Sequence, residues 1–121
     1  MLVLIGMLAA IAVTAFAGQR DRAAAAEAKA VARTAQIAME TYYMEHRAYA
    51  GATVAELVQV QPALRDAPGL VVRDATTTGY EIESSSRSTR PVTFIVERSS
   101  TGTITRSCIP GDGGGCKAGI W

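Results

Sequence analysis

The sequence predicts an α+β fold, in which a long N-terminal α-helix packs through its C-terminal half against a small antiparallel sheet of 3–4 strands. Three observations predict this architecture. Residues 1–18 carry no charge and lead directly into an Ala-rich segment that contains no Pro before Pro62. Beyond residue 70 the hydrophobic period changes to two, as in half-buried strands. Near the C-terminus, Cys108 and Cys116 bound a short polar loop.

The N-terminal helix divides into an apolar half and a polar half. Residues 1–18 form the apolar half, and residues 19–50 continue the helix into a head domain that spans residues 19–121. A helix that rises about 1.5 Å per residue would extend roughly 70 Å by residue 48, more than a small domain can bury alone. We therefore expect the apolar half to serve as a membrane span and to pack against other copies of the chain.

One side of the polar half is expected to pack against the sheet. Apolar residues recur there at i, i+4, i+7 and i+11. Neighbouring apolar residues are expected to enlarge this side. The set comprises Val31, Ala35, Ile37, Ala38, Met39, Tyr42, Tyr43 and Met44.

A short second helix is expected over residues 53–61. Gly51 suits the left-handed conformation that commonly follows a helix C-terminus. Thr53 and Glu56 then have the spacing of a capping box, and Pro62 ends the helix. Residues 63–69 are expected to form a connecting loop.

Antiparallel strands are expected within residues 70–107. They begin with Leu70–Val72, continue with the alternating segments that include Tyr80–Ile82 and Val92–Val96, and finish with Thr103–Arg106. The short intervening turns predict a meander with one face on the long helix and the other in water.

A disulfide is the preferred interpretation of Cys108 and Cys116, in a loop over residues 108–116, because the apolar N-terminus indicates export. Two free thiols in a reducing compartment are the alternative. By the loop-entropy model the bond would stabilise the head domain by roughly 2.5 kcal/mol.

The N-terminal segment Gly6-Met7-Leu8-Ala9-Ala10-Ile11-Ala12-Val13 resembles the conserved core of type IV pilins and type II secretion pseudopilins. The Gly-rich tail from Cys108 to Trp121 is similar to the cysteine-bounded ends of many pilin-like sequences. The order of long helix, capped short helix, strands and terminal loop also matches. The resemblance thus covers the whole chain, and its first motif is the more specific.

Two departures from the family pattern stand out. Upstream of this core, pilins carry a Gly cleavage site, a methylated N-terminal residue and a Glu within the apolar run, none of which is present here. We expect that Met1 is an internal methionine and that further helical residues precede it. The second departure is Thr14, where many pilins have a Pro that kinks the helix.

The resemblance implies a structural subunit of an extracellular filament, anchored in the cytoplasmic membrane by a single span before assembly and then exposed on the cell surface. Its partners would be copies of itself, inner-membrane lipid, and, if the upstream motif exists, a prepilin peptidase and assembly machinery. Close helix packing is expected at small residues, with inter-subunit ion pairs or a membrane-boundary role for three charged ones. These residues are Gly6, Ala9, Ala10, Ala12 and Thr14, and Arg20, Asp21 and Arg22.

Two alternatives stay open. A type II secretion pseudopilin would share these features, although the cysteine pair favours a pilin. A secreted soluble binding protein would instead lose residues 1–17 as a signal peptide, because Ala15-Phe16-Ala17 has the small-x-small pattern that precedes a cleavage site.

No catalytic residues, metal ligands or cofactors are predicted. His46 is the only His, and neither cysteine has a His nearby in sequence that would serve as the base for a reactive thiolate. Asp112 alone supplies too few oxygens for calcium. Nucleic-acid binding is not predicted either, because the arginines of residues 87–106 are interleaved with glutamates. Trp121 is expected to pack back on the sheet.

Overall fold

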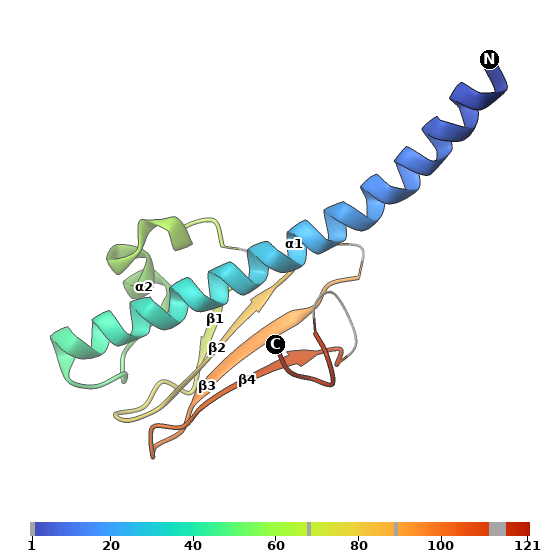
Figure 1. The fold of residues 1–121 in the computed structure, drawn as a ribbon. Helices are drawn as coiled ribbons and strands as arrows, with labels where there is room; N and C mark the ends of the chain where they lie inside the picture. The colour runs from blue at the N-terminus through green and yellow to red at the C-terminus, as the bar shows by residue number, and fades with distance from the viewer. Residues whose placement is uncertain (1, 68, 89, 112–115) are drawn as a thin grey trace.

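The computed structural model describes residues 2–67, 69–88, 90–111 and 116–121, with side chains described from Arg20 onward. The fold is α+β, with one long helix, α1, lying across a four-stranded antiparallel sheet. Figure 1 shows the N-terminal half of α1 extending well beyond the sheet, while the C-terminal half lies along it. The predicted fold class is thus confirmed at this level.

Helix α1 spans Leu2–His46, four residues short of the predicted end at residue 50. It ends because Arg47 adopts φ +57°, a left-handed conformation that no α-helix continues. Gly51 follows with φ +86°, and the Tyr42 hydroxyl donates a hydrogen bond of 3.2 Å to the Ala50 carbonyl, which folds the connection back against the helix. The predicted conformation of Gly51 is therefore confirmed, but in the connection rather than directly after the helix.

Helix α2 spans Val54–Val60 and is followed by a short 3-10 helix, η1, at Pro62–Leu64. The Thr53 hydroxyl accepts a hydrogen bond of 3.3 Å from the Glu56 backbone N–H, as the capping pattern predicts. Leu57 and Leu64 are buried and join the core on the side of α1 next to α2. The predicted range of 53–61 differs only by the two capping residues.

The four strands are β1 (Val71–Arg73), β2 (Tyr80–Ser85), β3 (Thr93–Arg98) and β4 (Ile104–Ile109), in the spatial order β1-β2-β3-β4. All neighbours are antiparallel, so the predicted meander is confirmed. The Gly102 N–H donates to the Ser99 carbonyl at 3.0 Å and closes the predicted turn between β3 and β4. Strand β4 extends beyond the predicted strand end at residue 107.

The core lies between the sheet and an alanine face of α1. This face consists of alanines with at most 4% exposure, spaced three or four residues apart: Ala25, Ala28, Ala32, Ala35 and Ala38. Opposite them, Ile82 in β2 and Phe94 and Val96 in β3 are fully buried. Because alanine has almost no side chain, the helix backbone can lie close to the sheet, and the larger strand residues fill the space between.

Candidate assembly surface

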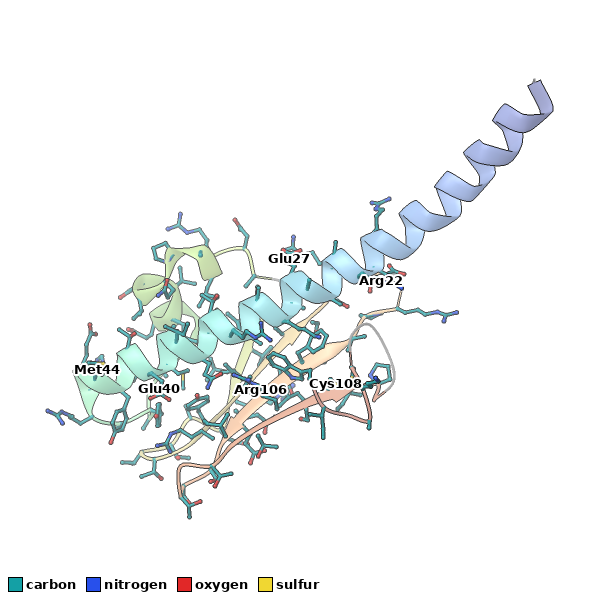
Figure 2. All side chains as sticks on the ribbon, in the orientation of Figure 1. Arg22, Glu27, Glu40, Met44, Arg106 and Cys108 are labelled. Carbon is teal, nitrogen blue, oxygen red and sulfur yellow. A yellow bond between two sulfur atoms is a disulfide. The ribbon has the colours of Figure 1, made fainter. Side chains whose placement is uncertain are left out.

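A row of uncharged residues runs along α1 on the side opposite the buried alanines. We call it the outer stripe; it consists of Ala23, Ala26, Ala30, Thr34, Ile37, Thr41 and Met44. These positions recur every three or four residues, so they share one face of the helix. Ile37 is 59% exposed and Met44 is 77% exposed. Figure 2 shows Met44 near the C-terminal end of α1.

Both hydroxyl groups of the outer stripe are satisfied within the helix. Thr34 Oγ1 donates to the Ala30 carbonyl at 2.8 Å, and Thr41 Oγ1 donates to the Ile37 carbonyl at 3.1 Å. Neither hydroxyl therefore needs a partner from outside. A stripe without charges or unsatisfied donors can be covered by an apolar surface at little desolvation cost.

The prediction that Ile37 and Met44 belong to the sheet-facing side was wrong. Ile37 and Met44 lie on the outer stripe, because successive helical residues turn by about 100° and these two fall opposite the buried Ala28 and Ala32. Tyr43 is 36% exposed and stacks on Tyr49 with ring centroids 4.8 Å apart. The other members of the predicted set are buried or partly buried.

An aromatic cluster fixes the end of α1 to the sheet. Tyr49 is 1% exposed and makes an edge contact of 4.8 Å with the Tyr80 ring. Its hydroxyl donates to the Glu40 carboxylate at 3.0 Å. Burial, followed by the hydrogen bond to Glu40, raises the pKa of Tyr49 to about 12. This cluster therefore joins the C-terminal end of α1 and the connection that follows it to β2.

The Tyr80 hydroxyl is buried and makes no hydrogen bond of good geometry in the described part of the chain. Burial raises the pKa of Tyr80, and the nearby Glu40 carboxylate contributes to the same rise. We regard the proximity to Glu40 as an electrostatic contact and not as a formed bond.

The predicted disulfide is present. Cys108 and Cys116 are bonded, with Cα atoms 5.9 Å apart, and both are buried. Cys108 lies in β4 beside Phe94 of β3, and its backbone N–H donates a hydrogen bond of 3.0 Å to the Gly119 carbonyl in the tail. The bond therefore ties the C-terminal tail to the edge strand of the sheet. Asp112, the rejected calcium ligand, lies outside the described residues.

The small residues predicted to pack between helices, Gly6, Ala9, Ala10, Ala12 and Thr14, lie in α1, but their side chains are outside the described residues. Of the predicted charged group, Arg20, Asp21 and Arg22 are exposed on the same helix. Figure 2 shows Arg22 where α1 leaves the sheet. The residues of the outer stripe begin next to Arg22 and run along α1 towards its C-terminal end.

Within the part of the chain that the structure describes, no helix is long and apolar enough to cross a membrane. The side chains of residues 1–19 lie outside that part. Nor do the described residues gather three or more His, Cys, Asp or Glu side chains in a metal-binding arrangement. The His46 ring is exposed and stacks on Tyr42, with centroids 4.0 Å apart.

Comparison of the chain with protein-family models, with curated proteins and with solved structures finds no match.

Proposed function

We propose that the chain is a structural subunit of a type IV pilus-like filament. In this proposal the apolar half of α1 anchors the protein in the cytoplasmic membrane and then packs among the same helices of other copies, with the filament exposed on the cell surface. One observation carries the proposal: α1 is a helix of 45 residues, and its N-terminal half extends well beyond the sheet against which its C-terminal half packs (Figure 1). No catalytic role is proposed.

The outer stripe supports the same proposal. In a filament whose centre is formed by these helices, each α1 helix needs one face that packs against its own head domain and another that packs against neighbouring helices. The alanine face meets the first need, and the outer stripe supplies a candidate for the second, with small or self-satisfied residues along most of its length. The resemblance of residues 6–13 to pilin N-termini agrees with this arrangement.

The pilus assignment, rather than a type II secretion pseudopilin, depends on the disulfide between Cys108 and Cys116, which closes the C-terminal loop. The competing function, a secreted binding protein without residues 1–17, makes a different prediction about processing. It requires a mature N-terminus at Gly18 and a protein free of membranes.

The test is fractionation of the cells that make the protein, combined with N-terminal sequencing. We expect the protein in the membrane fraction after alkaline carbonate extraction and in sheared surface filaments, with the apolar half intact. A protein found only in the soluble exported fraction, beginning at Gly18, would refute the proposal in favour of the secreted alternative.

A further inference from the structure

The sheet separates charges that the sequence interleaves. Arg98 and Arg106 share the helix-facing side of the sheet, because Arg98 alternates with Glu97 in β3 and Arg106 pairs with the buried Val96. Glu81, Glu83 and Glu97 lie on the opposite, outer side. Period-two alternation therefore places Arg98 and Arg106 on one face of the sheet and these three glutamates on the other, although Arg73 of β1 shares the face of the glutamates.

Three cations gather along the gap between α1 and β4. We call them the basic seam: Lys29, Arg33 and Arg106. The Trp121 ring lies between Arg33 of α1 and Arg106 of β4, at 5.7 Å and 5.4 Å from the two guanidinium groups. Figure 2 shows Arg106 between the helix and the strands.

The basic seam is held in place by aromatic rings. Trp121 packs edge-on against Phe94 at 5.5 Å, and its indole N–H donates to the Ile95 carbonyl at 3.3 Å, so the prediction that Trp121 packs on the sheet is confirmed. The Lys29 ammonium lies 5.6 Å from the Phe94 ring. Cations stacked on rings lose less conformational freedom on binding than free side chains do.

The seam has no carboxylate partner among the described residues. Arg106 donates to the Gln36 amide oxygen at 3.1 Å, a neutral acceptor. The nearest acidic residue on the same side of α1, Glu40, accepts the Tyr49 hydroxyl instead. The ion pair that the structure does describe joins Arg73 to Glu83, 3.0 Å apart, on the other face of the sheet.

That other face carries an excess of negative charge. We call it the acidic face: Asp74, Glu81, Glu83 and Glu97. Glu81 and Glu97 stand directly opposite each other in the register of β2 and β3, an unfavourable pairing of like charges. Burial, then the neighbouring carboxylates of Glu83 and Glu97, raises the pKa of Glu81.

An open hollow of about 290 Å³ lies at one end of the acidic face, lined in part by Asp74, Glu81 and Glu97. Arg98 also lines it, but its guanidinium donates to the Thr78 carbonyl at 3.0 Å and the Ser99 carbonyl at 3.3 Å. Three acidic residues thus line the hollow together with Arg98, which is bonded to backbone carbonyls.

We propose that the basic seam of one copy binds the acidic face of the next copy. Within one molecule the two surfaces lie on opposite sides of the sheet and cannot meet. Two seams would repel each other, as would two acidic faces, so the charges favour a head-to-tail contact over a two-fold one. Head-to-tail contacts leave a free surface at each end and propagate. The inference rests on the proposed self-assembly and adds the contact between head domains.

The test uses the full chain in detergent micelles, which cover the apolar half and leave the head domains to interact. Sedimentation velocity at low salt should show concentration-dependent association of the wild type that 0.5 M salt abolishes, since salt of this order screens exposed charges beyond about 4 Å. The seam variant Arg33→Glu/Arg106→Glu and the face variant Glu81→Lys/Glu97→Lys should each associate at least tenfold more weakly.

Mixing the seam variant with the face variant shows whether each one fails to associate because it lost the contact or because it no longer folds. The two variants together should regain association, because each supplies the charge that the other now needs. The matched control Arg65→Glu/Arg90→Glu makes the same change of net charge at exposed positions outside the seam and should behave as the wild type. Wild-type association by both variants, or no recovery on mixing, would overturn the proposal.

A polyanion is the competing occupant of the seam. The monomeric wild type is titrated with heparin or a single-stranded oligonucleotide, and we expect no binding that depends on the seam. Seam-dependent binding would be kept by the control variant and lost by the seam variant. Such binding, with the copies remaining monomeric, would assign the seam to a polyanion. The proposed function would survive this result, because it depends on helix packing through α1 and not on the seam.

Discussion

The Tyr49 hydroxyl lies 3.0 Å from each carboxylate oxygen of Glu40, and this hydrogen bond joins the connection after α1 to the helix itself. The Tyr49 ring also contacts the rings of Tyr43 and Tyr80. The Arg98 guanidinium lies over the Tyr49 ring, 5.4 Å from the ring centroid. One side chain thus contacts the helix, its C-terminal connection and two strands, and it should be sensitive to small changes.

Replacing Tyr49 with Phe removes the hydroxyl and keeps the ring. We expect the free energy of unfolding to fall by about 1 kcal/mol, because the exposed Glu40 carboxylate regains water while the hydrogen bond is lost. Urea denaturation followed by circular dichroism measures this. Tyr43→Phe, at the partly exposed neighbour, is the matched control and should change stability little; equal losses in both variants would contradict this role for the Glu40 bond.

Alkaline pH should weaken the fold through the same residue. The pKa of Tyr49 is raised to about 12 in the folded state, above its value in the unfolded chain. The stability that the neutral Tyr49 hydroxyl contributes is therefore fully present below the unfolded-state pKa, and it is lost as the pH rises through the folded-state pKa. Each tyrosine so shifted should lower the free energy of unfolding by about 1.4 kcal/mol per pH unit between pH 10 and 12.

The same denaturation series in Tyr49→Phe checks the assignment. Its slope between pH 10 and 12 should be shallower than that of the wild type, with a remainder from Tyr80, whose pKa is also raised. An unchanged slope would mean that Tyr49 ionises in the folded state as it does in the unfolded chain.

Removing the disulfide should destabilise the head domain. For Cys108→Ser/Cys116→Ser, the loop-entropy model gives a loss of about 2.5 kcal/mol, because the unfolded chain regains the freedom of the loop. Thermal denaturation with and without reductant measures this loss, and the serine variant should be insensitive to reductant. A wild type whose melting is equally insensitive would show that the cysteines are not joined in solution.

The two faces of α1 should respond differently to the same substitution. Ala32 is fully buried against the sheet, whereas Ala30 is exposed on the outer stripe. Ala32→Leu should therefore cost about 1–3 kcal/mol through overpacking. Ala30→Leu should leave the stability of the head domain nearly unchanged and reduce filament formation, because a bulky side chain separates packed helices. Reduced stability in Ala30→Leu would mean that the stripe is not an outer surface.

Much of the fold follows from local patterns in the sequence. The alanine spacing, the Thr53 cap and the alternation in Tyr80–Glu83 and Val92–Val96 each act over a few residues, and each appears in the structure. The position of Ile37 and Met44 was missed because both were assigned by proximity to buried residues. The helix turn places them on the opposite face.

The basic seam was harder to foresee, since it depends on tertiary structure. Lys29 and Arg33 come from α1, Arg106 from β4 and Trp121 from the tail, and only the crossing of helix and sheet brings them together. A signal was present, however. Successive residues of a strand point to opposite faces of the sheet. Assigning each charged residue to a face in this way separates Arg98 and Arg106 from Glu81, Glu83 and Glu97.

The most direct test of helix-mediated assembly is photo-crosslinking in the cells that make the protein, with p-benzoylphenylalanine in place of Ile37. Irradiation should give a ladder of multimers, because each copy links to its neighbour through the outer stripe. Gln59, exposed on α2, is the matched control position and should give no such ladder. Only monomers from the Ile37 position in surface-exposed material would contradict the proposed assembly through α1.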